Sequence, residues 1–103
     1  MICLEISVNG EKVCTTGAAD GILQATVDAV GPRWTGAEEI TAKAEDSGLF
    51  HLIATGIVKD SGATELVRWI PCRRLAVGDE VSIRIVSSEH ADVPVERVPY
   101  GKR

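Results

Sequence analysis

An Asn-Gly pair near the N-terminus constrains the fold more than any other feature of this sequence. Asn9-Gly10 separates two short segments in which apolar and polar residues alternate, residues 4–8 and 11–16. Asn-Gly favours the two-residue turn of a β-hairpin, because both central residues must adopt positive φ. A tight turn would place Ile6 opposite Val13. The sequence therefore predicts an N-terminal β-hairpin.

The alternation also assigns two faces to this hairpin. We expect one face to point into the core, and it carries Ile2, Leu4, Ile6, Val8 and Val13. The other face would carry Cys3, Glu5 and Cys14. In this register Cys3 and Cys14 are diagonal neighbours at about 7–8 Å, beyond the ~6.8 Å that a disulfide allows between Cα atoms. A one-residue bulge would change that spacing.

Further strands are predicted along the chain. Each segment is rich in apolar residues and bounded by turn residues; they are residues 22–30, 49–58, 65–70 and 80–86. Gly31-Pro32 and Pro71 would each end a strand, because proline cannot donate to a ladder. Residues 75–79 predict a tight corner. An edge strand of such a fold could serve as a dimer surface, but the strand order cannot be read from the sequence.

Residues 35–46 allow two interpretations. Thr35 and Glu38 have the spacing of a helix-capping box, and Ala37, Ile40 and Ala44 form a helical stripe. The same segment also alternates as a strand would, but alanine and glutamate are poor strand formers. We favour a short helix here. The whole pattern predicts a mostly β fold, an antiparallel β-sandwich or small barrel of about six or seven strands with room for one short helix.

Length and charge limit the organisation and the partners. The chain of 103 residues fits one domain, and we expect a β domain over residues 1–90 followed by an extended polar tail over residues 91–103. The net charge of −4 disfavours nucleic acid, whose phosphates select basic surfaces. No stretch approaches the ~18 apolar residues of a membrane span. We expect no membrane association.

The cysteines and the N-terminus suggest the compartment. An odd number of cysteines, three, argues against a disulfide framework. The first residues lack the basic segment and cleavage site of a signal peptide. We therefore expect a cytoplasmic protein.

No catalytic, metal or cofactor signature stands out. The candidate metal ligands, Cys3, Cys14, Cys72, His51 and His90, are scattered singly, without the paired short spacings of a zinc site. The glycines occur singly and form no phosphate-binding loop. Neighbouring acidic residues in a strand point to opposite faces, so we do not expect the adjacent carboxylates to form a catalytic pair. We expect a protein that is not an enzyme and that binds neither a metal nor a cofactor.

Two Arg-Trp pairs are the candidate binding residues, because arginine and tryptophan are enriched at interaction hot spots. They occur in two predicted loops or strand ends, and with two further arginines the candidate residues are Arg33, Trp34, Arg68, Trp69, Arg73 and Arg74. Trp69 can also be interpreted as a large core residue, and we favour that interpretation. Trp34 lies close to a proline and is expected to be exposed. We predict a non-catalytic interaction module whose partner is another protein or a second copy of the chain.

Two alternatives and a minor third remain open. Cys72, beside Arg73 and Arg74, could be the nucleophile of a small enzyme or redox sensor if the arginines lower its pKa. Residues 65–74 together with the basic end, residues 97–103, could bind nucleic acid. A small molecule could also bind in the mouth of a barrel.

Two stretches resemble a set of small bacterial proteins of unknown function. The first is Glu5–Gly10 with Cys14 and Gly17, and the second is Arg68-Trp69 followed by Leu75–Ile83. The resemblance covers about a third of the chain and consists mainly of turn and strand residues. It implies a bacterial, stand-alone protein and assigns no functional residue.

Overall fold

The computed structural model describes residues 1–30, 49–60 and 62–100. These residues contain seven strands and no helix: β1 (Ile2–Val8), β2 (Glu11–Gly17), β3 (Gly21–Val30), β4 (Leu49–Asp60), β5 (Ala63–Leu75), β6 (Val81–Ser87) and β7 (Glu96–Pro99). The segment for which helix and strand were weighed, residues 35–46, lies outside the described residues.

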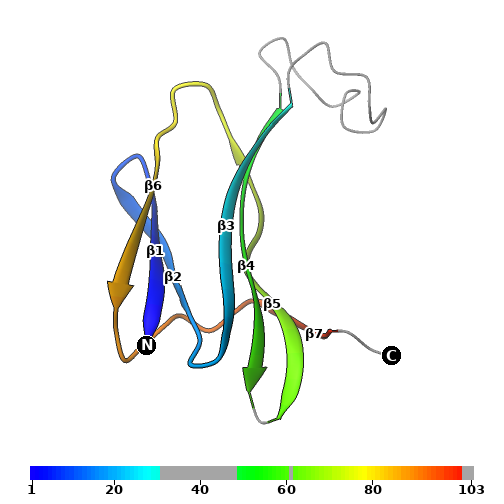
Figure 1. The fold of residues 1–103 in the computed structure, drawn as a ribbon. Helices are drawn as coiled ribbons and strands as arrows, with labels where there is room; N and C mark the ends of the chain where they lie inside the picture. Colours follow the sequence, from blue (N-terminus) through cyan, green and yellow to red (C-terminus); the bar gives the residue numbers. More distant parts are fainter. Residues whose placement is uncertain (31–48, 61, 101–103) are drawn as a thin grey trace.

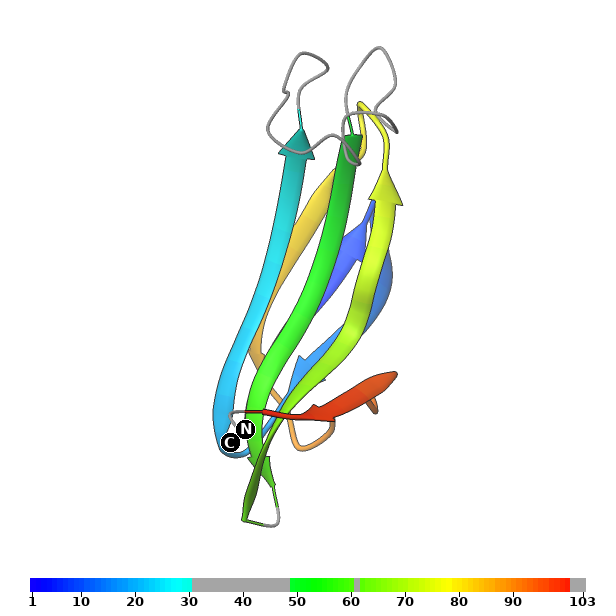
Figure 2. The same ribbon diagram turned by 90° about the vertical axis from the view of Figure 1, so that its right-hand side faces the viewer.

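The strands form two antiparallel sheets that pack face to face. One sheet has the order β2-β1-β6 and the other the order β3-β4-β5-β7. Figure 1 shows the two sheets side by side, and Figure 2 looks onto the larger one, where β3, β4 and β5 run nearly the whole length of the molecule. The prediction of a mostly β, sandwich-like fold is confirmed.

The predicted N-terminal hairpin is present, but its register is not the predicted one. Asn9 and Gly10 have φ angles of 53° and 81°, as the turn requires. Beyond the turn, a bulge between Ile6 and Ser7 shifts the pairing, so that Ile6 lies opposite Cys14 instead of Val13. Since residues opposite each other share a face, Cys14 joins the core face. Its predicted place on the outer face with Cys3 was wrong.

Strand β5 continues past Pro71, where the sequence predicted an end. Its pairing with β4 is irregular on both sides of Ala54, so that Ile70 faces Ala54 while Arg73 faces Leu52. Pro71 therefore falls within a bulge. A proline is tolerated at a bulge, since the missing N–H is not needed there. The strand resumes its ladder and ends at Leu75.

The core lies between the two sheets and is mainly aliphatic. The smaller sheet contributes Ile6, Val8 and Cys14, and the larger sheet contributes Leu52, Ala54, Val58, Val67, Trp69, Ile70 and Leu75. Each set follows the period-2 alternation of its strand except where a bulge intervenes. The mainly aliphatic core agrees with the small share of aromatic residues in the composition.

A corner between β5 and β6 is held by one carboxylate. The Ala76 N–H donates to Asp79 Oδ2 at 2.8 Å, and the Asn9 side-chain amide donates to Asp79 Oδ1 at 3.0 Å. The Glu80 N–H in turn donates to Asn9 Oδ1 at 2.9 Å. The predicted corner is thus present, and it is tied to the hairpin turn of β1 and β2.

After β6 the chain crosses from one sheet to the other. Residues 88–95, here called the crossing segment, run along one end of the sandwich to β7 (Figure 1). Asp92 fixes the crossing segment to β2: its N–H donates to Thr15 O at 2.8 Å, and its Oδ2 accepts from the Thr15 N–H at 2.9 Å. β7 then pairs with residues 65–68 of β5. Residues 96–99 of the predicted tail therefore belong to the larger sheet.

Candidate functional site

Trp69, one of the predicted binding residues, lies in the core. Its side chain is 7% exposed, and its Nε1–H donates to the Asp92 carbonyl oxygen at 2.6 Å. A buried indole needs such an acceptor, because an unpaired N–H would lose its hydrogen bonds to water. Trp69 thus occupies the core position that the sequence offered as its alternative role. It fastens the crossing segment to the larger sheet.

The predicted arginines within the described residues, Arg68, Arg73 and Arg74, do not form one patch. Arg68 is half-buried and pairs with Glu96 at 3.2 Å. Arg73 and Arg74 are exposed near the end of β5, opposite Leu52 and His51 of β4. Successive strand residues point to opposite faces, so these two guanidinium groups are directed apart.

The remaining predicted binding residues, Arg33 and Trp34, lie outside the described residues. No arrangement of theirs relative to β5 follows from the structure. Binding by the six predicted residues stays a prediction.

The three cysteines are free thiols in different surroundings. Cys72 is exposed, whereas Cys3 and Cys14 are buried. Burial, together with the nearby negative charge of Asp92, raises the pKa of the Cys14 thiol to about 11. Cys14 is therefore protonated and a poor nucleophile at neutral pH. A Cys72-based activity stays a prediction.

Within residues 1–30, 49–60 and 62–100, no three His, Cys, Asp or Glu side chains are placed to hold a metal ion together. The same part of the chain contains no helix of the length and apolar character needed to cross a membrane.

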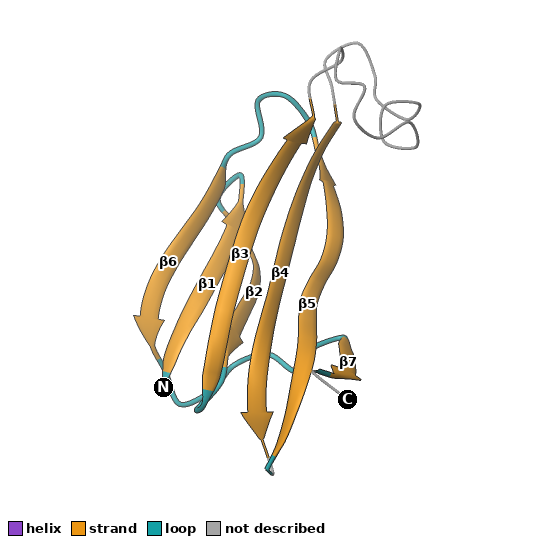
Figure 3. Ribbon diagram, turned by 45° about the vertical axis from the view of Figure 1, so that its right-hand side comes forward, coloured by secondary structure: helices purple, strands orange, loops and turns teal. Residues whose placement is uncertain are grey.

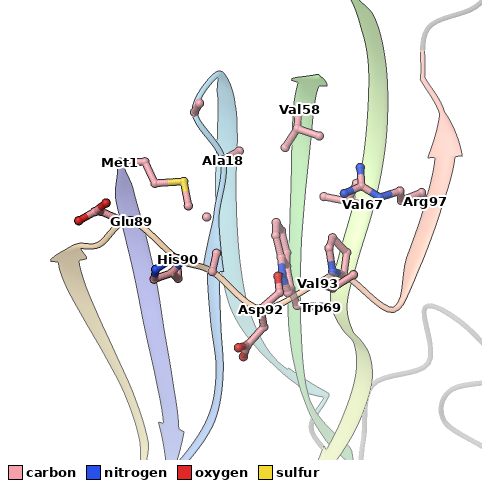
Figure 4. Close-up of a pocket in the computed structure, with 14 residues that line it drawn as sticks. Met1, Ala18, Val58, Val67, Trp69, Glu89, His90, Asp92, Val93 and Arg97 are labelled. Carbon is pink, nitrogen blue, oxygen red and sulfur yellow. The ribbon is translucent and has the colours of Figure 1, made fainter. Parts of the chain in front are cut away.

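A pocket of about 360 Å³ opens beside the crossing segment. Trp69, Val58 and Val67 form its apolar wall, as Figure 4 shows, with Glu89 at one end and Arg97 at the other. Arg97 is engaged with Glu65 at 3.0 Å. The lining comes from segments far apart in the sequence, so no local motif could have revealed this pocket.

A second feature, separate from this pocket, is an apolar surface between the edge strands β3 and β6. Large side chains are exposed here although they point toward the inside of the sandwich: Ile2 is 59% exposed, Ile83 45%, Ile85 74% and Val27 51%. Their direction follows from the register, because Ile83 lies opposite the fully buried Ile6, and Val27 opposite the fully buried Leu52. We call these four residues, with the backbone of β6, the open edge.

Neighbouring side chains extend the open edge into a hollow. A depression of about 550 Å³ is lined by Ile2, Leu4 and Ile85 of the smaller sheet and by Leu23 of β3, together with Met1, Ala18, Ala19 and Gly21. Residues of both sheets therefore line one apolar depression. Figure 3 shows why it is uncovered: β6 continues the smaller sheet beyond β1 at the flank where β3 ends the larger sheet.

The opposite flank of the sandwich is covered. There the backbone of the edge strand β2 is bonded at Thr15 by Asp92, and the Arg68 carbonyl of β5 accepts from the Val95 N–H at 2.8 Å. Trp69 fills the space beneath. The contrast between the two flanks points to the open edge as the candidate functional site.

Of the residues of the open edge, Ile2 was predicted to face the core, and it shares that face of β1 with the buried Ile6. The exposure of these residues was not predicted, because a strand at an edge has the same alternation as a strand in the middle of a sheet. Only the strand order separates the two cases.

Comparison with known proteins adds no relative: no family model, no curated protein and no solved structure matches the chain.

Proposed function

We propose that the protein is a non-catalytic interaction module that binds a polypeptide chain through the open edge. The observation that carries this proposal is the exposure of Ile2, Val27, Ile83 and Ile85, which point inward from both sheets. Each buried Å² of such apolar surface contributes about 25 cal/mol when it is removed from water. Contiguous apolar surface of this kind marks interaction sites on soluble proteins.

The backbone of β6 favours a polypeptide as the partner. Among the described strands, β6 has β1 as its one neighbour, so its other side offers a row of N–H and C=O groups. An added strand satisfies those groups and places alternate side chains against the open edge. A small ligand could cover the isoleucines but would leave this row unpaired.

Binding by the six arginine and tryptophan residues predicted from the sequence stays a separate proposal, outside the open edge. Arg73 and Arg74 are exposed at the end of β5, away from the pairing of β5 with β7. The cytoplasmic location, the bacterial origin, and the alternatives of a Cys72-based activity and nucleic-acid binding stay predictions, and no contact described above favours either alternative.

The proposal is tested by comparing captured partners of three immobilised proteins: wild type, Ile85→Lys and Val95→Lys. Val95 is a matched control, because it is 69% exposed but lies outside the open edge, whereas Ile85 is 74% exposed within it. We expect Ile85→Lys to lose at least tenfold of the captured protein, whether this is a host protein or the chain itself, and Val95→Lys to retain it.

Circular dichroism should show that both variants keep the wild-type strand content. Equal capture by Ile85→Lys and wild type would contradict the proposal.

A further inference from the structure

We propose that the occupant of the open edge is a second copy of this chain, joined to the first by antiparallel pairing of β6 with β6 about a two-fold axis through Ile83. The inference rests on the proposed function, since it names the partner of that surface.

The hydrogen bonds at both ends of β6 show which of its residues are free to pair. At one end Met1 and Ser88 exchange two bonds, of 3.0 and 2.9 Å. At the other end the Asn9 N–H donates to Glu80 O at 2.8 Å. The ladder between is regular, and bonded pairs alternate along an antiparallel ladder. The even-numbered residues therefore bond to β1, and the odd-numbered residues direct their backbone groups outward.

These outward groups belong to the residues with apolar, inward-pointing side chains. Of the four odd-numbered residues of β6, Val81, Ile83 and Ile85 are apolar and Ser87 is polar. A two-fold axis through Ile83 makes it pair with itself and places Val81 of one copy opposite Ile85 of the other. On the outer face, Ser82 then lies opposite Arg84. Each of the three apolar, inward-pointing residues thus meets an apolar residue, and the backbone groups that can form hydrogen bonds lie in register.

The neighbouring registers are less favourable. An axis through Arg84 would set two guanidinium groups opposite each other, and like charges in that position are destabilising. An axis through Ile85 would place Ile83 opposite Ser87 and Arg84 opposite Val86. An axis one residue before Ile83 would move Ile85 beyond the end of the facing strand. The strand is therefore most complementary to itself about Ile83.

On the outer face, this register keeps the two Arg84 side chains from lying directly opposite each other and brings each within reach of an acidic residue. The Arg84 side chain is 77% exposed and lies 3.8 Å from Glu5 of its own chain, so it can also reach across the edge. The diagonal neighbours of Arg84 would be both Glu80 and Arg84 of the second copy, at a distance that long side chains span. An acidic residue of each copy would thus approach a basic residue of the other.

The second sheet supplies a further argument for a copy over a foreign strand. A two-fold axis perpendicular to the sheets keeps the inner face of one copy continuous with the inner face of the other. Because β3 ends the larger sheet on the same flank, Val27 and the hollow lined by Leu23 and Ile85 also come to lie at the junction. A single foreign strand added to β6 would extend only the smaller sheet and would bring no second large sheet to the junction.

Disulfide trapping tests both the partner and the register, in a Cys72→Ser background that removes the exposed thiol. Ile83→Cys should cross-link to itself, because the Cα atoms of a bonded pair lie about 5.5 Å apart, within the range for a disulfide. Ile85→Cys alone should not cross-link, because its two copies would lie four positions apart, about 13 Å. A mixture of Val81→Cys and Ile85→Cys proteins should form the mixed dimer.

The outcomes separate this inference from the proposed function. Sedimentation velocity should show a dimer for wild type and Val95→Lys and a monomer for Ile83→Lys. A monomeric wild type, or cross-linking of Ile85→Cys without Ile83→Cys, would overturn the self-pairing. Capture of a foreign protein that Ile85→Lys loses would then still support the open edge as a binding site, whereas unchanged capture would reject that as well.

Discussion

At the scale of single residues, one carboxylate organises the end of the sandwich where two turns meet. Asp79 accepts hydrogen bonds from the Asn9 side chain and the Ala76 backbone. The pKa of Asp79 lies below its ordinary value of 3.8. The hydrogen bond from Asn9 lowers it most, followed by the hydrogen bond from Ala76 and the charge of Arg73. The carboxyl group is therefore more easily ionised in the folded chain than in the unfolded one.

This shift predicts how stability changes with pH. Since the folded-state pKa lies below the unfolded one, the contribution of Asp79 is complete above pH 3.8 and is lost as the pH falls through the folded value. Asp79→Ala should therefore be less stable than wild type at pH 6, and the gap in the free energy of unfolding should narrow between pH 4 and pH 2. Urea denaturation at each pH measures this.

Glu89→Ala serves as the control for the loss of one acidic side chain. A gap between Asp79→Ala and wild type that stayed constant over this pH range would contradict the assignment.

At the scale of the elements, the crossing segment packs closely on the smaller sheet. A Cβ added to Gly17 would lie 2.7 Å from Cys3 Sγ and 2.9 Å from Ala91 Cβ. Both distances are too short for carbon and sulfur atoms in contact. Cys3 is fully buried for the same reason, because the crossing segment covers what would otherwise be the outer face of β1.

Gly17→Ala is therefore expected to destabilise the fold by about 1–3 kcal/mol, the usual cost of overpacking. Chemical denaturation measures the loss. Adding Ala91→Gly removes one of the two close contacts and should recover part of it. A Gly17→Ala protein as stable as wild type would show that the crossing segment does not pack as described.

The elements also show what the sequence could predict. The hairpin turn at Asn9-Gly10 and the corner at residues 75–79 depend on local backbone preferences, and both are present. The bulge beside Ile6 and the passage of β5 through Pro71 depend on how neighbouring strands fit together. No local pattern encodes that fit. The burial of Trp69 was the favoured interpretation, but its bond to Asp92 joins β5 to the crossing segment, which is distant in the sequence.

At the scale of the whole molecule, strand order creates the candidate site. Ile83 and Ile85 have the alternation of any half-buried strand, and only their place on β6, at the end of the order β2-β1-β6, leaves them exposed. The same order places β3 on that flank. Sequence periodicity gave the direction of these side chains but could not give their exposure, which depends on the arrangement of both sheets.

The proposed dimer predicts a melting temperature that depends on concentration. Binding to the folded state stabilises by mass action, and a tenfold rise in concentration is worth about 1.4 kcal/mol per dimer. We expect the melting temperature of wild type to rise by about 3–5 °C for each tenfold increase. Calorimetry over a hundredfold range measures this. Ile83→Lys should show no such dependence, and a flat wild-type curve would contradict dimer formation.

The bonds that Asp92 makes to Thr15 also bear on where assembly stops. An uncovered strand on both flanks would let each molecule add to the next, and such head-to-tail contacts grow into open-ended fibres. Here the backbone of Thr15 at the edge of β2 is already bonded within the chain, which disfavours addition of a further strand to the smaller sheet at that residue. The proposed pairing through β6 would then stop at two copies, and the proposed dimer would not extend into a fibre.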